Sequence, residues 1–201
     1  MAVKKLIEVW DGAHLVNKNI NFLKQKTKKV RIPFNGNINM ILTDLLDTYK
    51  STPCAGIAAN QIGYDSSIFI GLKEDKEEDE EETNVIGNPH SNNYEFYINP
   101  EIYHSTKKSI QEGEEGCLSI PEIRIIAERF DKIKIKYYNE NGEKIKKPLS
   151  GFMSRLFQHE LDHLNGILMV ENSKITSAYK ISENKNLDSL YIELTKKILQ
   201  H

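Results

Sequence analysis

The sequence predicts an α+β fold, in which short antiparallel strands and separate helices form one unit. Residues 131–138 (DKIKIKYY) alternate lysine with isoleucine, and the Asn-Gly pair at 141–142 that follows is typical of tight hairpin turns. Residues 151–165 space apolar side chains and histidines by three or four positions, as one face of a helix requires. Leu187, Leu190, Tyr191, Leu194 and Ile198 form an apolar stripe that predicts a C-terminal helix.

Two further elements are expected in the first half of the chain. Residues 38–50 place their apolar side chains on one helical face, which predicts a helix. The segment 53–63 (PCAGIAANQIG) is rich in small residues, so its backbone can approach another group closely. Residues 66–72 (SSIFIGL) then predict a short buried strand.

An acidic loop insertion is expected at about 73–93. Residues 73–82 (KEDKEEDEEE) carry mostly like charges, which repel one another and cannot enter a core. Strand-like composition resumes at 95–103 (EFYINPEIY), so the insertion lies between two strands. It either shapes access to a site or is only a solvated excursion.

Length and composition limit the number of domains, the kinds of partner and the cellular location that the sequence allows. At about 150 residues per domain, 201 residues predict a single domain over 1–201. The 27 basic and 29 acidic side chains leave a formal net charge of -2, which gives no global reason to bind DNA or an anionic membrane. Two cysteines are a poor disulfide framework, and no stretch is long enough to cross a membrane or to serve as a signal peptide. We therefore expect free thiols and a cytoplasmic location.

The sharpest chemical pattern is HELDH at residues 159–163, within the predicted helix 151–165. Two helix positions four residues apart differ by about 40° in direction and about 6 Å along the axis, so both imidazoles can bind one metal ion. Glu160 lies about 100° from His159 around the axis, where it can act on a water beside the metal without becoming a ligand. The alternative is a pair of partly buried helix histidines.

Two more segments supply a candidate third ligand and a candidate hydrogen-bond donor for this metal site. A catalytic zinc-like site needs a third protein ligand, and Cys117 in EGCLS (115–119) is the candidate, because the preceding glycine leaves room around its thiol. Taken alone, Cys117 is also a small buried hydrophobe. In GIAANQ (56–61), the amide of Gln61 can donate to an oxyanion, with tight packing of small residues as the alternative.

Together these segments resemble the peptide deformylases, whose pattern is a Gly-rich segment ending in Ala-Ala-x-Gln, then Glu-Gly-Cys-Leu-Ser, then Gln-His-Glu-x-Asp-His. They occur here in that order as GIAANQ, EGCLS and QHELDH. SIPEIR after Cys117, Arg129 and DHLNG also resemble the family, and the resemblance covers roughly residues 55–170. It implies small antiparallel β-sheets around a central helix that carries HELDH, plus a C-terminal helix, in one catalytic domain over 1–201.

The resemblance implies the reaction and its metal. The reaction is hydrolysis of the formyl group from N-formylmethionine on newly made polypeptides, which releases formate. One divalent metal ion is expected, Fe(II) before Zn(II), Ni(II) or Co(II), with Cys117, His159 and His163 as ligands. The partners implied are N-formylmethionyl nascent peptides, with a transient ribosome contact for which the run 24–31 is a weak candidate.

The resemblance also implies roles for single residues. Glu160 would be the general base and then the acid. Gln61 and the backbone N–H of Leu118 would stabilise the tetrahedral oxyanion. Glu115 would orient a substrate or ligand group, with a solvated loop position as the alternative.

Substrate contacts follow from the same resemblance. An extended peptide would pair with backbone at Gly56 and Gly116. Phe152 and Leu156 are expected to line the methionine pocket, with ordinary core positions as the alternative, and Arg155 is expected to point away from it. Asp162 is expected to pair with Arg129 and so fix the ligand helix, with an exposed aspartate as the alternative.

Two departures from the family pattern and two competing functions stay open. Cys54 stands where the family usually has a glycine, which leaves a second thiol near the metal, and Asn60 precedes Gln61 where proline or a small residue is common. An HExxH zinc peptidase would need a further ligand downstream of His163. A catalytically inactive metal-binding module would have no use for both Glu160 and Gln61.

Overall fold

A computed structural model describes residues 3–34, 36–75, 87–172, 174–181 and 192. The helical elements are α1 (Asn17–Leu23), α2 (Gly36–Ser51), η1 (Ala59–Ile62), α3 (Gly151–Leu164) and η2 (Met169–Glu171). The strands are β1 (Gly56–Ala58), β2 (Ile68–Leu72), β3 (Tyr94–Ser105), β4 (Ile110–Cys117), β5 (Ile120–Phe130), β6 (Ile133–Tyr138), β7 (Lys144–Leu149) and β8 (Ile175–Lys180).

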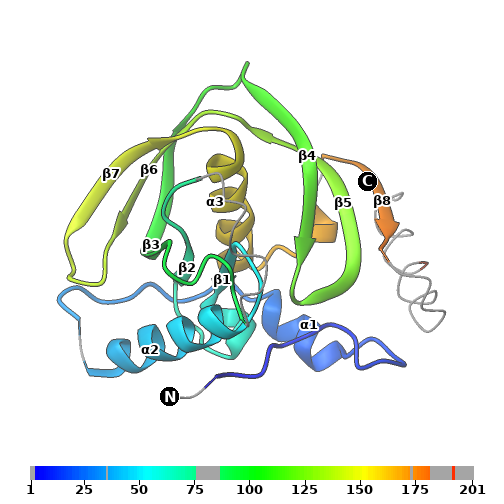
Figure 1. The fold of residues 1–201 in the computed structure, drawn as a ribbon, viewed down its shortest axis with the longest axis horizontal. Helices are drawn as coiled ribbons and strands as arrows, with labels where there is room; N and C mark the ends of the chain where they lie inside the picture. The colour runs from blue at the N-terminus through cyan, green and yellow to red at the C-terminus, as the bar shows by residue number, and fades with distance from the viewer. Residues whose placement is uncertain (1–2, 35, 76–86, 173, 182–191, 193–201) are drawn as a thin grey trace.

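These strands form two antiparallel sheets on either side of α3. The larger sheet has the order β1-β2-β3-β6-β7 and the smaller one the order β4-β5-β8. Figure 1 shows α3 lying between the two sheets, with α2 and α1 beneath them. The predicted α+β class and the central position of the HELDH helix are therefore confirmed.

β2 shows why the core forms at this place. All five of its residues are buried, because the strand is covered on both faces. Ile68 and Ile70 pack into one cluster with the buried face of α2, while Phe69 packs on the opposite side against Phe157 of α3. The predicted helix 38–50 and strand 66–72 are both present, and the helix extends to Gly36 and Ser51.

The predicted hairpin and histidine helix are also present. β6 and β7 pair antiparallel, and the turn between them places Gly142 at a φ of 77°, a conformation that favours glycine. α3 ends at Leu164, and Gly166 follows with a φ of 74°. This left-handed residue just beyond the helix stops it as the sequence predicts.

The sequence analysis missed four strands, β1, β4, β5 and β8. β4 (IQEGEEGC) buries only Glu115 and Cys117, so its strand conformation depends on pairing with β5 and not on apolar alternation of its own. The predicted C-terminal helix lies outside the described residues apart from position 192, and so do residues 76–86 of the acidic insertion. Among the described residues, no helix is both long and apolar enough to cross a membrane.

Candidate metal centre

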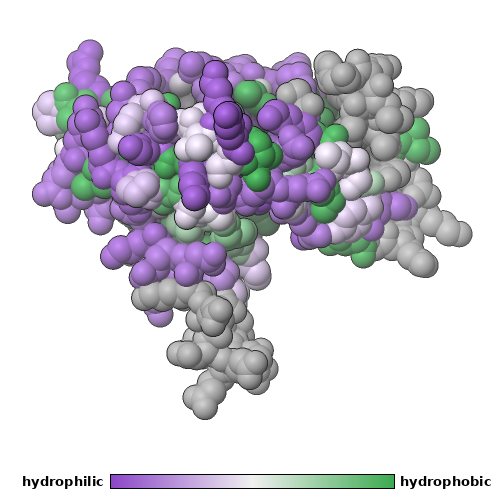
Figure 2. Space-filling model, turned by 90° about the horizontal axis from the view of Figure 1, so that it is seen from above, coloured by the Kyte–Doolittle hydropathy of each residue, from purple (hydrophilic) through white to green (hydrophobic). Residues whose placement is uncertain are grey.

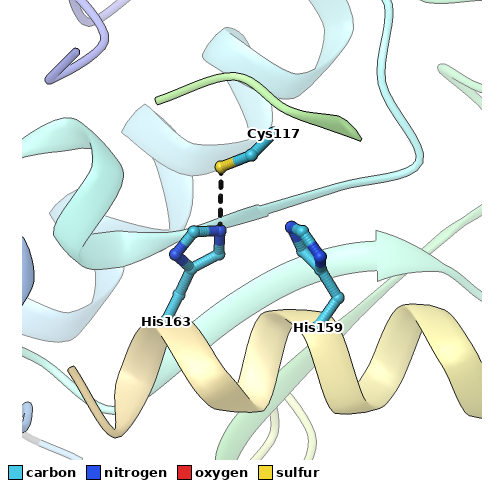
Figure 3. Close-up of side chains that lie close together, drawn as sticks. All are labelled: Cys117, His159 and His163. Atoms are coloured by element: carbon cyan, nitrogen blue, oxygen red, sulfur yellow. Dashed lines mark hydrogen bonds between the residues drawn. The ribbon is translucent and has the colours of Figure 1, made fainter. Parts of the chain in front are cut away.

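Cys117, His159 and His163 converge from two separate elements. Both histidines project from α3, and Cys117 is the last residue of β4 (Figure 3). The Sγ atom of Cys117 lies 3.2 Å from Nε2 of His163, and the ligand atoms of the three residues all lie within 4.8 Å of one another. All three side chains are buried. A thiolate and two imidazoles are a donor set that suits a divalent transition metal, so these residues fit such an ion.

Glu115 fixes the orientation of His159. The Nδ1–H of His159 donates to Oε2 of Glu115 at 2.9 Å, which leaves Nε2 as the lone-pair nitrogen facing the centre. Arg129 donates to both oxygens of the same carboxylate at 2.8 and 2.9 Å, and Arg155 donates to Oε1 at 2.8 Å. Glu115 therefore orients a ligand group, and the solvated alternative for this residue is wrong.

Arg129 also joins the centre to the outer face of α3. It donates through Nη1 to Oδ2 of Asp162 at 2.5 Å, which confirms the expected pair. The buried carboxylate of Glu115 and the half-exposed carboxylate of Asp162 thus share one guanidinium. This network holds the His159 turn of the helix against β4 and β5.

The segment GIAANQ approaches the centre from the other side. Asn60 donates through Nδ2 to the backbone oxygen of His163 at 2.7 Å. The Nε2 group of Gln61 points toward Cys117, 3.6 Å from Sγ and 3.2 Å from Oγ of Ser119, while its Oε1 accepts from the Ala58 N–H at 2.9 Å. The amide orientation of Gln61 is therefore fixed by three contacts.

The two cysteines have opposite electrostatic environments. Burial alone would raise the pKa of Cys117, but the adjacent His163 and His159 lower it well below its usual value. Burial likewise opposes the charged form of His159, yet its bonds with Cys117 and Glu115 raise the pKa of this imidazole. Burial raises the pKa of Cys54, and the nearby carboxylate of Glu160 adds to the effect. Cys117 is thus poised as a thiolate ligand, whereas Cys54 stays a neutral thiol.

Glu160 lies beside this centre with a carboxylate that is only partly engaged. A Cβ atom on Gly56 would lie 2.7 Å from its Oε1, so the missing side chain at Gly56 makes the approach of the two segments possible. Its Oε2 is buried and has no hydrogen-bond partner among the described residues. Burial raises the pKa of Glu160, which brings its proton exchange closer to neutral pH.

A cavity of about 510 Å³ opens directly onto the centre. It is bordered by GIAANQ, by the end of β4 and by α3, and by Ile181 near its mouth. Phe152 lines it with 42% of its surface exposed, so the core alternative is wrong for this residue; Leu156 lines it from a buried position. Size and position make this cavity suited to an extended peptide end.

Arg155 corrects one expectation. It contributes to the cavity lining and does not point away from it. Its charge is tolerated there because Nη1 donates to Glu115 and to the backbone oxygens of Gly113 and Ala127, at 2.8 to 3.1 Å. An arginine satisfied in this way presents little unpaired charge to an apolar ligand.

The remaining predicted residues lie around the same cavity. Leu118 is in the tight turn between β4 and β5, next to Cys117, and lines the cavity. A Cβ atom on Gly116 would lie 2.5 Å from Nη1 of Arg124, so this glycine makes room for an arginine side chain at the cavity wall. The structure therefore gathers all the predicted site residues around one centre: Gly56, Gln61, Glu115, Gly116, Cys117, Leu118, Phe152, Leu156, His159, Glu160 and His163.

Sequence reasoning missed the supporting roles of Asn60 and Ser119. Asn60 was noted only as a departure, yet it ties the first motif to the backbone of the ligand helix. The hydroxyl oxygen of Ser119 accepts a hydrogen bond from Nε2 of Gln61. Its backbone oxygen accepts one from the N–H of Val9 at 2.9 Å. The sequence did contain a sign of this role, because Asn60 is a polar residue in a stretch rich in glycine and alanine.

Known proteins match this arrangement over most of the chain. A family model described as Polypeptide deformylase matches residues 13–178. A peptide deformylase of Aquifex aeolicus is 36% identical over 152 residues, which cover 76% of this chain and 82% of that protein.

Solved structures are similar as well. The crystal structure of peptide deformylase from Thermotoga maritima matches with a TM-score of 0.68 at 29% identity, covering 88% of this chain and all of that one. A class I type b peptide deformylase from Acinetobacter baumannii, solved with Met-Ala-Ser bound, matches with a TM-score of 0.67 at 27% identity, covering 85% of this chain and 98% of that one.

Proposed function

This chain belongs to the peptide deformylase family, metal-dependent hydrolases that remove the N-formyl group from new polypeptides, and we propose how its residues divide that work. Cys117, His159 and His163 would hold the metal. When bound, a divalent ion would supply Lewis-acid chemistry there, polarising a carbonyl oxygen and lowering the pKa of a water toward neutrality. The deformylase is favoured over the peptidase and the inactive module because Cys117 lies where a third ligand is needed, and because Glu160 and Gln61 line the same cavity.

Glu160 is proposed to carry the proton. It takes a proton from the attacking water as the new C–O bond forms at the formyl carbon. It then gives that proton to the amine nitrogen as the C–N bond breaks, so formic acid and a free α-amine result. The observation that carries this proposal is the buried Oε2 of Glu160, which has no partner in the described chain and lies beside the three converging ligands.

Gln61 and the backbone N–H of Leu118 are proposed to stabilise the oxyanion. One N–H of the Gln61 amide faces a thiolate sulfur at 3.6 Å, a long contact that a developing negative oxygen can replace. The Ala58 N–H holds the other end of the amide, so little reorganisation is needed during the reaction. A donor that is held in place before the reaction acts where charge develops.

The cavity is proposed to bind the peptide. Backbone at Gly56 and Gly116 would pair with an extended chain, because both positions border the cavity. Phe152 and Leu156 would contact the methionine side chain, and Glu115 would act on the substrate only indirectly, through His159. The match to a deformylase solved with Met-Ala-Ser bound supports a peptide of this kind as the occupant.

Fe(II) is proposed as the working metal, because the family resemblance implies it; the Cys-His-His donor set also accepts Zn(II), Ni(II) and Co(II). The test is formate release from formyl-Met-Ala-Ser by protein purified without oxygen and reconstituted with each of the four metals in parallel. Cleavage of unformylated peptides is followed in the same samples. The highest kcat/KM with Fe(II) is expected.

Each alternative outcome changes a specific proposal. A higher kcat/KM with another metal would replace Fe(II). Internal peptide cleavage without formate would favour the peptidase. Absence of formate with every metal, in folded and metal-loaded protein, would favour the inactive module.

The wider setting of the enzyme is also a proposal. Residues 1–201 would act as one catalytic domain, which is supported by a cavity bordered by segments from both sheets and α3. The protein would work in the cytoplasm on nascent chains, in transient contact with ribosomes. Sedimentation of the protein with ribosomes carrying formylated nascent chains tests this setting.

A further inference from the structure

The β6–β7 hairpin turns one basic face away from the core. Side chains alternate along both strands, so Ile133, Ile135 and Tyr137 are buried while their neighbours face outward. In Figure 2, hydrophilic side chains predominate at the end of the molecule that carries β6 and β7 in Figure 1. The outward positions hold the residues of what we call the hairpin face: Lys134, Lys136, Lys144 and Lys146.

The charges on the hairpin face are not balanced internally. Lys136 stands directly opposite Lys146 in the sheet register, an arrangement of like charges that destabilises a strand pair. Lys136 is paired with Glu101 at 2.8 Å, but Lys134, Lys144 and Lys146 form no ion pair within the described chain. Glu101 of β3 adjoins this face opposite Lys136, and Glu140 and Glu143 occupy the hairpin turn at its margin.

A cavity and an exposed aromatic ring adjoin this face. The cavity, of about 460 Å³, lies at the open end of the hairpin, opposite its turn, and is lined by Lys132, Lys134 and His104 together with apolar and hydroxyl side chains. Tyr103 of β3 is 48% exposed, and Nζ of Lys146 lies 5.9 Å from its ring centre. Lysines beside a flat aromatic surface are the combination that binds a phosphate backbone and stacks a base.

The basic run at 24–31 is a poorer candidate for the same task. Lys28 is paired with Asp65 at 2.7 Å and Lys29 with Glu101 at 2.6 Å, and Lys24 is paired with Glu171. Three of its cations are thus already matched with carboxylates. The weak ribosome contact predicted for this run is therefore better placed on the hairpin face.

We propose that the hairpin face binds the phosphate backbone of RNA. This inference rests on the proposed function, since an enzyme that meets its substrate on new polypeptides works beside ribosomal RNA. RNA fits better than an acidic protein, because the lysines adjoin both a cavity and an exposed ring that can hold a phosphate and a base. Binding would also relieve the repulsion between Lys136 and Lys146.

The test measures binding of the full chain to a fluorescein-labelled 20-nucleotide uridine RNA by anisotropy, over a range of salt concentrations. The variant K134Q/K144Q/K146Q removes three charges from the hairpin face. The matched control K5Q/K18Q/K26Q removes three exposed lysines near the N-terminus. We expect the hairpin variant to bind about tenfold more weakly at low salt, and its salt slope to shrink by about 2, given about 0.7 per phosphate contact on single strands.

Three results would overturn the proposal: an unchanged affinity in the hairpin variant, an equal loss in the control, or tighter binding of poly-glutamate than of RNA. Formate release from a short formylated peptide is measured on the same samples, because the hairpin face takes no part in that reaction. Formate release without RNA binding rejects this inference alone. RNA binding without formate release rejects the proposed function instead.

Discussion

At the scale of single residues, the two cysteine thiols are chemically identical but lie in different electrostatic environments. Cys54 and Cys117 both border the main cavity, but only Cys117 has histidines that favour its thiolate. Cys54 is half-buried near Glu160 and accepts a long contact from Nδ2 of Asn88 at 3.7 Å. Cys54 is not among the three residues whose ligand atoms converge, and its raised pKa disfavours the thiolate that metals bind.

This difference predicts unequal effects of two matched substitutions. Cys117→Ser should remove most of the bound metal, because a hydroxyl is a far weaker ligand than a thiolate. Cys54→Ser should keep a metal content near that of the unaltered protein. Elemental analysis of both variants after anaerobic reconstitution decides the matter, and loss of metal from both would show that Cys54 is a ligand.

Glu160→Gln should separate chemistry from metal binding. The amide fills the same space beside Gly56 but cannot take up a proton, so kcat should fall by roughly 10²- to 10⁴-fold. Metal content should stay unchanged, since Glu160 is not among the three converging ligands. Formate release and metal analysis on the same sample test both parts, and near-normal kcat in this variant would refute the assignment of the base.

Glu115→Gln should weaken both the metal site and the fold. Two buried arginines would lose their carboxylate, which typically costs about 3 to 5 kcal/mol of unfolding free energy. His159 would lose the acceptor that orients its ring, and metal affinity should fall about 10- to 100-fold. Urea unfolding and metal competition with a chelator measure the two effects.

The control for Glu115 is a carboxylate paired at the surface. Asp65→Asn breaks the exposed pair with Lys28 and should cost no more than about 1 kcal/mol. Equal losses in the two variants would mean that the buried network contributes nothing special to stability.

At the scale of elements, the parts predicted from sequence were those with a strong period of their own. α3 and the β6–β7 hairpin carry regular apolar spacing and a clear stop or turn, so the histidine pair was assigned correctly to one helical face. β4 has no such period, because its exposed residues include an isoleucine and its buried residues include Glu115. Its strand conformation comes from partners that lie distant in the sequence.

The same limit applies to the site. The order of the motifs predicts Cys117 as a ligand, and the structure brings it close to His159 and His163. The contacts of Glu115 with Arg129 and Arg155, in contrast, depend on how β4, β5 and α3 pack together. Arg155 is expected to point away because an unpaired charge would be unfavourable in the wall of an apolar methionine pocket. Its four backbone and side-chain acceptors on neighbouring strands could not be seen from the sequence.

A glycine-to-alanine substitution just beyond α3, which adds one methyl group, tests how closely the end of this helix packs. A Cβ atom on Gly166 would lie 2.3 Å from the backbone oxygen of Lys24, and its φ of 74° is also unfavourable for other residues. Gly12 has a φ of 101° but no atom within 4 Å of the added Cβ. Gly12→Ala should therefore cost only the conformational penalty of about 1 to 2 kcal/mol, and Gly166→Ala distinctly more.

Urea unfolding of these two variants gives the comparison. The extra loss at Gly166 reports the contact between the end of the ligand helix and the segment after α1. Similar losses of unfolding free energy in both variants would mean that the structure around Gly166 adjusts to the added methyl group without loss of stability.

At the scale of the whole molecule, the N-terminal segment braces the site from outside. The N–H of Ile7 donates to the backbone oxygen of Gln61 at 2.8 Å, and the N–H of Val9 donates to that of Ser119 at 2.9 Å. One extended segment thus joins the two motifs that present Gln61 and Leu118. The N-terminal segment is in turn attached to α2, so this attachment helps to hold the proposed oxyanion donors in place.

That attachment centres on Asp44, which should make it dependent on pH. Asp44 accepts a hydrogen bond from the Tyr64 hydroxyl and pairs with Lys4 at 3.1 Å, and these partners lower the pKa of its carboxyl. The folded protein therefore binds fewer protons at Asp44 than the unfolded chain, whose aspartates titrate near 3.9. The stabilisation is fully present above that pH and is lost as pH falls through the lower folded pKa.

Asp44→Asn should consequently reduce the unfolding free energy most near pH 7, and the difference from the unaltered protein should shrink steadily below about pH 4. Urea unfolding at a series of pH values measures it, with the exposed Glu140→Gln as a control expected to change little. A difference that stays constant at all pH values would mean that the shape of the Asp44 side chain matters and its charge does not. If the difference shrinks as expected, formate release at pH 7 should also fall in Asp44→Asn, because a looser N-terminal segment no longer braces Gln61 and Ser119.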